Sequence, residues 1–359
     1  MPDAISLGVG EPDFETPMNI RTQAIYSLEQ GKTFYTSNAG LPVLRQEICK
    51  YVERKYNVSY NPKNEILITV GGSEAIDMGL RCVLDPGDEV IIPQPAYVSY
   101  EPCTIMAGGK PVIIDLKAEN EFRLTPEELE AAITPKTKVL ILPFPNNPTG
   151  AIMEAKDLEA IIPIIIKHDL IVMSDEIYAE LTYTGKHVSI ASYPGMKERT
   201  ILINGFSKAF AMTGWRLGYA CGPAEIIEQM TKLHQYAIMC APTLSQYGAI
   251  EAVKNSDEEV ENMVKQYNQR RRFLLSELER LGLDCFEPGG AFYVFPSIKK
   301  TGMTSEEFAT KLLESQKLAV VPGNAFGRSG EGFIRISYAY SIDNLKEGIR
   351  RIEEFLKNV

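Results

Sequence analysis

Seven short, almost continuously apolar runs, rich in β-branched residues, recur along the first 221 residues of this 359-residue chain. Runs of this kind suit strands that are buried on both faces. Helix-like segments separate several of them, which predicts an α/β fold with a mostly parallel seven-stranded sheet flanked by helices. The expected strands are residues 65–70, 89–93, 111–115, 138–142, 170–174, 200–204 and 217–221.

The pattern changes after about Val253, where long charged segments of helical character replace the apolar runs. Helices are expected at 257–281, from 305 and at the C-terminus, with short strands at 291–295 and 333–337. A single core stops growing near ~250 to 300 residues, so two domains are expected. We predict a large domain at residues 15–275 and a smaller α+β domain made of residues 1–14 and 276–359.

Charge and composition narrow the classes of partner. The chain has 47 acidic and 37 basic residues, a net charge of -10 that would repel nucleic acid and anionic membranes, so small molecules are the expected partners. The six cysteines form no Cys-x-x-Cys pair and the three histidines lie far apart, so no metal site is predicted. The first residues lack the pattern of a signal peptide, and we expect a cytoplasmic protein.

Polar and glycine-rich segments follow several of the expected strands. Because ligands of open α/β sheets bind outside the carboxyl ends of the strands, these segments are the candidate site. Gly71-Gly72-Ser73-Glu74 opens a helix, where free N-H groups suit a phosphate. Asn147 lies in a proline-rich turn, and Asp175 and Tyr178 follow the fifth run. A tight turn, a rigid turn and a helix N-cap are the alternative explanations of these segments.

Lys208 lies between Phe206 and Phe210, shortly after the sixth run. Apolar neighbours and nearby cations depress the pKa of a lysine, and its amine then forms a Schiff base with an aldehyde. Pyridoxal phosphate is the expected aldehyde, because Asp175 would pair with its protonated pyridine nitrogen. Taken alone, a lysine in such a run is more often a solvated surface residue.

Four motifs of this chain resemble those of the class I aminotransferases of fold type I, the aspartate and aromatic aminotransferase family that depends on pyridoxal phosphate. They follow in the order Asn146-Asn147-Pro148-Thr149-Gly150, Ser174-Asp175-Glu176-Ile177-Tyr178, Ser207-Lys208 through Gly214-Trp215-Arg216, and Phe333-Ile334-Arg335-Ile336-Ser337. The resemblance implies transfer of an amino group from an L-amino acid to a 2-oxo acid, with 2-oxoglutarate expected, by a ping-pong mechanism. The donor stays open among aspartate, aromatic and alanine-like amino acids, and a fold type I carbon-sulfur lyase is the alternative.

The resemblance also implies a role for each candidate residue. Lys208 would be the Schiff-base lysine and the catalytic acid and base, and Arg335 would hold the substrate α-carboxylate. Tyr35 would cross to the phosphate of a partner subunit, which implies a homodimer. The implied cofactor-binding residues are Tyr35, Gly72, Ser73, Glu74, Tyr97, Asn147, Asp175, Tyr178, Ser207, Lys208 and Arg216, and the implied substrate-binding residues are Gly10, Asn147 and Arg335.

Three features depart from the family pattern. Gly205 stands where relatives often carry a serine among the phosphate donors. Leu233 to Val253, where aspartate-specific relatives of one subgroup place an arginine for the distal carboxylate, contains neither Arg nor Lys, so strict aspartate specificity by that device is not expected. The sequence also begins almost directly at the segment around Gly10, and the N-terminal arm of relatives is expected to be missing.

Overall fold

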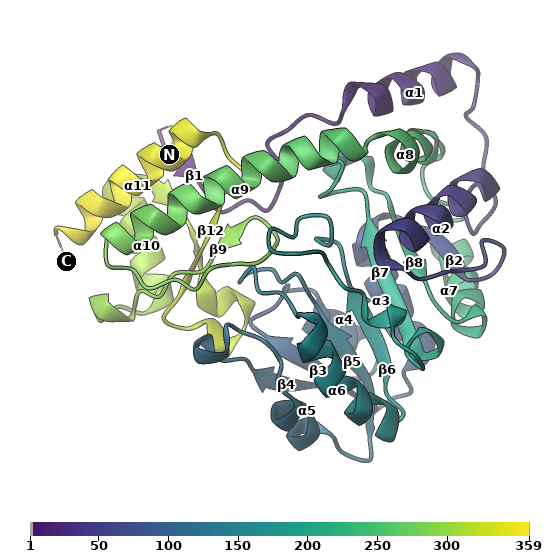
Figure 1. The fold of residues 1–359 in the computed structure, drawn as a ribbon, viewed down its shortest axis with the longest axis horizontal. Helices are drawn as coiled ribbons and strands as arrows, with labels where there is room; N and C mark the ends of the chain where they lie inside the picture. Colours follow the sequence, from purple (N-terminus) through teal and green to yellow (C-terminus); the bar gives the residue numbers. More distant parts are fainter. Residues whose placement is uncertain (1–2, 359) are drawn as a thin grey trace.

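The computed structural model describes residues 3–358 and has a seven-stranded sheet at the centre of its larger part (Figure 1). The strand order is β2-β8-β7-β6-β5-β3-β4, and β8 alone runs antiparallel to its neighbours. All seven predicted runs are strands of this sheet, which confirms the predicted fold class. The strands are β2 (Ile66–Thr69), β3 (Glu89–Gln94), β4 (Lys110–Asp115), β5 (Thr137–Leu142), β6 (Ile171–Asp175), β7 (Thr200–Gly205) and β8 (Gly218–Cys221).

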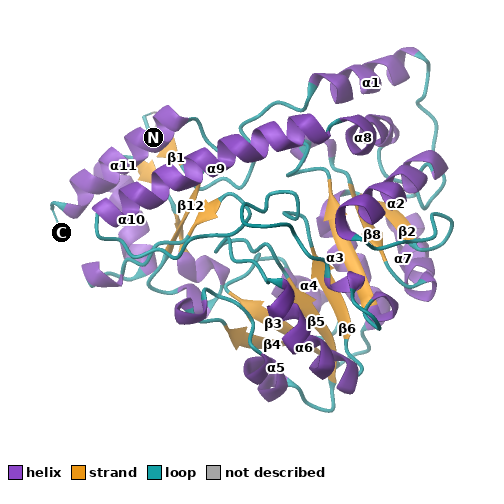
Figure 2. Ribbon diagram, viewed as in Figure 1, coloured by secondary structure: helices purple, strands orange, loops and turns teal. Residues whose placement is uncertain are grey.

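Both faces of the sheet are covered, as Figure 2 shows. In β5, Val139 packs in one apolar cluster with residues of α3 and α7, whereas Leu140 packs in another with residues of α6. This alternation explains why the strands are apolar throughout. The helices up to this point of the chain are α1 (Met18–Glu29), α2 (Pro42–Tyr56), α3 (Gly71–Val83), α4 (Tyr100–Met106), α5 (Pro126–Ala132), α6 (Ala155–Lys167), α7 (Ala224–Ala237) and α8 (Thr243–Asn255).

α5 begins with a capping box. Thr125 Oγ1 accepts from the backbone N-H of Glu128, while the Glu128 carboxylate accepts from the backbone N-H of Thr125, at 3.3 and 3.2 Å. This reciprocal pair satisfies two N-H groups that the first turn leaves free. None of the helices within residues 3–358 combines the length and apolarity that crossing a membrane requires.

The last third of the chain forms smaller sheets and three long helices, of which α9 runs across the molecule in Figure 1. β1 pairs in parallel with β10, which places the N-terminal segment beside the C-terminal third. The predicted boundary at residue 275 falls inside α9, and the division into two domains stays a prediction. These elements are β1 (Ile5–Ser6), α9 (Asp257–Arg280), β9 (Tyr293–Val294), α10 (Ser305–Gln316), β10 (Leu318–Ala319), β11 (Val321–Pro322), β12 (Ile334–Ser337) and α11 (Ile342–Leu356).

Short 3-10 helices complete the connections between these elements, and the order of the second small sheet is β11-β12-β9 with antiparallel pairing. One of the 3-10 turns follows β11 and carries Phe326 toward the large sheet, where the Phe326 carbonyl accepts from the N-H of Ala96 at 3.0 Å. The 3-10 helices are Ala118–Asn120, Ile190–Ser192, Lys197–Arg199, Thr213–Trp215, Lys299–Thr301, Gly323–Phe326 and Arg328–Gly330.

Gly218 lets the first turn of α3 lie directly against β8. A Cβ at Gly218 would lie 2.6 Å from the carbonyl carbon of Gly71 and 2.7 Å from the nitrogen of Gly72. Its strand partner Gly205 is also confined, because a Cβ there would lie 3.0 Å from the Cα of Gly218. A side chain at Gly205 would therefore crowd the backbone of Gly218 and Leu217.

We predict that Gly218→Ala lowers the free energy of unfolding by about 1 to 3 kcal/mol, since a methyl group forced against backbone displaces α3 or β8. Urea denaturation followed by circular dichroism measures the change. Gly214→Ala is the matched control, because a Cβ at Gly214 meets no atom within 4 Å. Equal stability of the two variants would contradict the assigned contact.

Candidate active site

A cavity of about 490 Å³ opens at the carboxyl ends of β2, β5 and β6. Eleven of the predicted site residues line it, although they come from segments far apart in the sequence. They are Gly10, Gly72, Ser73, Tyr97, Asn147, Asp175, Tyr178, Ser207, Lys208, Arg216 and Arg335. The sheet therefore gathers the segments that follow its strands, as the rule for open α/β sheets requires.

Lys208 projects its amine into this cavity from the turn between β7 and β8. The Nζ atom donates a hydrogen bond of 2.6 Å to the Gly10 carbonyl and lies 5.9 and 5.8 Å from the ring centroids of Tyr178 and Phe292. Burial lowers the pKa of Lys208 to about 8; Glu11 opposes the shift and the Arg335 charge adds to it. The lowered pKa leaves more of the amine neutral near pH 7 than an exposed lysine has, which suits a nucleophile or base.

Asp175, the last residue of β6, is buried with 6% of its surface exposed. Its carboxylate accepts from the Tyr100 hydroxyl at 2.7 Å and from the Ile177 N-H at 3.2 Å. Burial raises the pKa of Asp175, and the hydrogen bond from Tyr100 opposes that rise. A carboxylate in this position is stabilised by a cation placed in the cavity.

The start of α3 forms an anion-binding end of the cavity. Gly72 and Ser73 lie in its first turn, where N-H groups have no partner within the helix. The Arg216 guanidinium lies beside this turn, since a Cβ at Gly71 would be 2.6 Å from its Nη2 atom. Ser207 adds a hydroxyl to the lining. This set of donors suits a phosphate dianion.

The side chain of Glu74 does not line the cavity. Its carboxylate contacts Nδ1 of the buried His234 at 2.9 Å and accepts from the Val70 N-H at 2.5 Å. A carboxylate facing the cavity would repel a phosphate, whereas in this position it complements the dipole of α3. Any contact of Glu74 with a phosphate would therefore come from its backbone.

Arg335 also lines the cavity. Its Nη1 donates to Asn147 Oδ1 at 2.7 Å, its Nη2 donates to the Gly8 carbonyl, and Nε is buried without a partner among residues 3–358. The guanidinium lies 4.5 Å from the ring centroid of Tyr293 and 4.7 Å from that of Phe326. A planar cation held between two rings suits recognition of a carboxylate.

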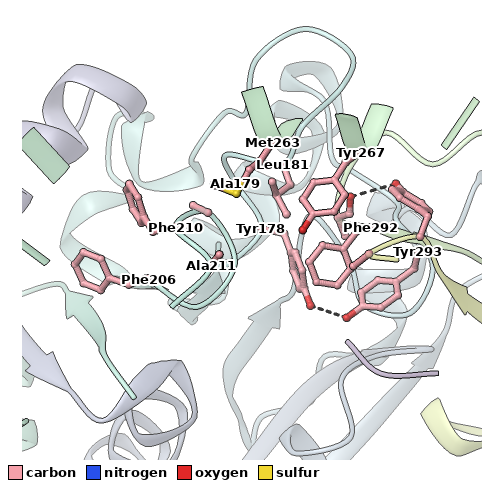
Figure 3. Close-up of a cluster of buried hydrophobic side chains, with 14 of the residues drawn as sticks. Tyr178, Ala179, Leu181, Phe206, Phe210, Ala211, Met263, Tyr267, Phe292 and Tyr293 are labelled. Carbon is pink, nitrogen blue, oxygen red and sulfur yellow. Dashed lines mark hydrogen bonds between the residues drawn. The ribbon is translucent and has the colours of Figure 1, made fainter. Parts of the chain in front are cut away.

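The aromatic wall between these two ends contains residues that the sequence analysis missed. Figure 3 shows the Tyr178 and Tyr293 hydroxyls facing each other, at 2.8 Å. A Cβ at Gly10 would lie 2.3 Å from the Tyr293 hydroxyl, so a glycine is required at this approach. Tyr293 lies in a segment expected to be a strand and Tyr100 lies three residues after Tyr97, but no sequence signal shows that these two residues face the cavity.

Tyr35 lies outside the cavity, with 82% of its surface exposed. The other groups fit a phosphorylated pyridine aldehyde: an anion site at α3, a buried carboxylate for a ring N-H, and an amine of lowered pKa between them. They line one cavity, in which Lys208 and Asp175 are each buried. The residues present therefore fit pyridoxal phosphate.

Residues 2–352 match the family described as aminotransferase class I and II. The chain is 52% identical over 356 residues to a putative aminotransferase, YugH, of Bacillus subtilis strain 168, covering 99% of this chain and 92% of that protein. It is 49% identical over 360 residues to an aspartate aminotransferase of Pyrococcus abyssi, again covering 99% and 92%.

Among solved structures, an aromatic aminotransferase from Pyrococcus horikoshii superposes with a TM-score of 0.98 at 47% identity, over 100% of this chain and 96% of that one. These likenesses do not favour the carbon-sulfur lyase alternative. Together with the cavity, they confirm the resemblance: the chain belongs to the class I and II aminotransferases and is a pyridoxal-phosphate-dependent enzyme of amino-group transfer.

Proposed function

We propose that Lys208 is the covalent anchor and proton carrier of this aminotransferase and that Arg335 holds the α-carboxylate of its substrates. The observation that carries this assignment is the placement of the two cations in one cavity, with the Lys208 amine of lowered pKa facing the same space as the buried Arg335 fork. When bound, pyridoxal phosphate supplies an electron sink for the bond broken at the substrate Cα.

The remaining roles follow from the donors at each end of the cavity. Gly72, Ser73, Ser207 and Arg216 would hold the phosphate, and Asp175 would hold the ring N-H. The Asn147 side chain accepts from Arg335 through Oδ1, which leaves its amide nitrogen to donate to the ring oxygen. Tyr178 would make the second contact with this oxygen. Tyr97 lines the same cavity and would lie against the ring face.

Lys208 would carry the proton during the reaction. Its neutral amine would accept a proton from the substrate Cα, and the resulting ammonium would donate a proton to the C4' carbon of the cofactor. The Gly10 carbonyl, which accepts from Nζ in this structure, orients the amine. The Gly8 carbonyl, two residues earlier, accepts from Arg335, so the N-terminal segment contacts both cations.

We further propose that the preferred donors carry aromatic or other apolar side chains, with 2-oxoglutarate as acceptor. The cationic residues of the cavity lining are Lys208, Arg216 and Arg335, and each already has a role. The lining also includes the apolar residues Val98, Val321, Ala325 and Phe326, of which Val321 is the strand partner of Arg335 and Phe326 contacts its guanidinium. A distal carboxylate buried there would lack a cationic partner, which is costly, so that of the acceptor 2-oxoglutarate, one methylene farther from Cα than that of aspartate, would have to reach solvent.

A homodimer is proposed from the surface around Tyr35. Phe34, Tyr35 and Tyr236 each have more than 80% of their surface exposed. Hydrogen bonds join the two segments, because Asn38 donates to Gln235 at 3.4 Å. Exposed aromatic side chains gathered in one place are typical of protein interfaces. A second copy of the chain would bury them and bring its Tyr35 to the phosphate end.

We predict that kcat/KM for phenylalanine or tyrosine exceeds that for aspartate by roughly tenfold or more, because a buried, unpaired carboxylate loses at least one charged hydrogen bond. Glutamate formed from 2-oxoglutarate is the measurement.

Arg335→Lys should raise KM for every donor, because the forked contact is lost, whereas Arg328→Lys on the exposed surface should not. Faster turnover of aspartate would overturn the donor assignment, and sulfide release from cysteine without an acceptor would indicate a lyase.

A second prediction concerns the pH dependence of cofactor attachment. The rate at which cofactor-free protein takes up pyridoxal phosphate should rise with pH and level off above about 8, since the neutral amine reacts and the pKa of Lys208 is lowered to about 8. Stopped-flow absorbance gives the rate, and borohydride reduction with peptide mapping identifies the lysine. Free Nα-acetyl-lysine is the control for protonation changes of the cofactor itself. Its rate of reaction with pyridoxal phosphate should keep rising toward roughly pH 10, the ordinary pKa of a lysine.

The third prediction tests the dimer. Tyr35→Phe should weaken cofactor binding by roughly 3- to 30-fold, because one hydrogen bond to a charged phosphate is lost, while sedimentation shows an unchanged dimer. Tyr26→Phe, which removes a half-exposed hydroxyl from α1, should leave the dissociation constant unaltered. A monomer in solution, or equal affinities in the two variants, would refute the role of Tyr35.

A further inference from the structure

Tyr100 makes a buried contact that none of the roles assigned above uses. It is the first residue of α4, and 3% of its surface is exposed. Its hydroxyl donates to Asp175 Oδ2 at 2.7 Å. In the sheet, β5 separates β3, which precedes Tyr100, from β6, which ends at Asp175. The hydrogen bond therefore ties together two segments that the sheet keeps apart.

The contact fixes the orientation of the Asp175 carboxylate. The other oxygen, Oδ1, accepts from the N-H of Ile177, two residues farther along the same turn. Within residues 3–358, Tyr100 makes the one hydrogen bond to this carboxylate that comes from another part of the fold. A hydroxyl is not needed for packing at this place, since phenylalanine would fill the same volume.

Tyr100 also fixes the ring of Tyr97. The two rings meet edge to face, with centroids 5.7 Å apart and planes at 82°. The backbone reinforces this contact, because the N-H of Tyr100 donates to the Tyr97 carbonyl at 3.3 Å. Tyr100 thus contacts both Asp175, which would bind the nitrogen of the cofactor's pyridine ring, and Tyr97, which would lie against the face of that ring.

The charges around Asp175 explain why such a donor matters. Burial raises the pKa of Asp175, Glu176 raises it further, and Lys208 lowers it. The hydrogen bonds from Tyr100 and Ile177 lower it as well, because they stabilise the ionised carboxylate. Without the Tyr100 hydroxyl, the carboxylate would keep its proton to a higher pH and would lose its fixed rotation.

We propose that Tyr100 is a positioning residue, which holds Asp175 and Tyr97 in the arrangement that the pyridine ring of the cofactor requires. The proposal rests on the function assigned to Asp175 above. It predicts an effect on the bound cofactor and on turnover, without an effect on recognition of the amino donor, because the contacts of the Arg335 guanidinium are with Asn147, Gly8, Tyr293 and Phe326.

The test compares Tyr100→Phe with Tyr60→Phe. Tyr60 is also buried, and its hydroxyl has no partner among the described residues, so its loss controls for removal of a buried hydroxyl. Tyr100→Phe should weaken pyridoxal phosphate binding by roughly 10- to 100-fold, as expected when a hydrogen bond to a charged group is lost. It should also lower kcat while KM for the donor stays unchanged. The midpoint of the pH titration of the bound cofactor's absorbance should move to higher pH, because Asp175 keeps its proton to a higher pH.

A double-mutant cycle with Asp175→Asn keeps the test decisive if Tyr100→Phe is unstable. The effect of Tyr100→Phe on cofactor affinity should largely disappear when Asp175 is already asparagine. Additive effects, or a Tyr100→Phe protein that matches Tyr60→Phe in affinity, kcat and titration, would overturn the proposal. If the unmodified protein failed to bind pyridoxal phosphate, the assigned function would fall with it, whereas normal binding by both Phe variants would remove the role of Tyr100 alone.

Discussion

The structure depends on a sheet that is buried on both faces. Because helices cover the two faces, polar side chains can reach a ligand only at the strand ends, and the parallel strands bring their carboxyl ends to one edge. Asp175 at the end of β6 and Asn147 after β5 meet there for this reason. The antiparallel strand β8 brings Arg216, just before its start, to the same edge.

Close backbone contact at this edge sets the shape of the phosphate end. Gly205 and Gly218 lie opposite each other in β7 and β8, and Gly218 touches the first turn of α3. Glycine at these positions removes the side chains that would separate helix and sheet. The dipole and free N-H groups of α3 therefore act at the cavity, where Arg216 adds a fixed charge.

Burial and charge together give the cavity its chemistry. Desolvation favours the neutral amine at Lys208 and the protonated acid at Asp175, and neighbouring groups limit both shifts. Tyr100 stabilises the Asp175 carboxylate, while Arg335 adds to the lowering of the Lys208 pKa. The Asp175 carboxylate suits a cationic ring nitrogen, and the neutral amine of Lys208 suits an aldehyde. The two groups line the same cavity at separate points.

The sequence by itself predicted the seven strands, because apolar β-branched runs have few other stable arrangements. It also indicated Lys208, Asp175 and Arg335 as candidate site residues through motifs in a fixed order, and all three line one cavity. Tertiary structure alone decided the rest. It turned the Glu74 carboxylate away toward His234, and it brought Tyr100 to Asp175 and Tyr293 to Gly10. Such contacts join residues tens to hundreds of positions apart, so local propensity and spacing carry no record of them, and packing of the whole chain sets their geometry.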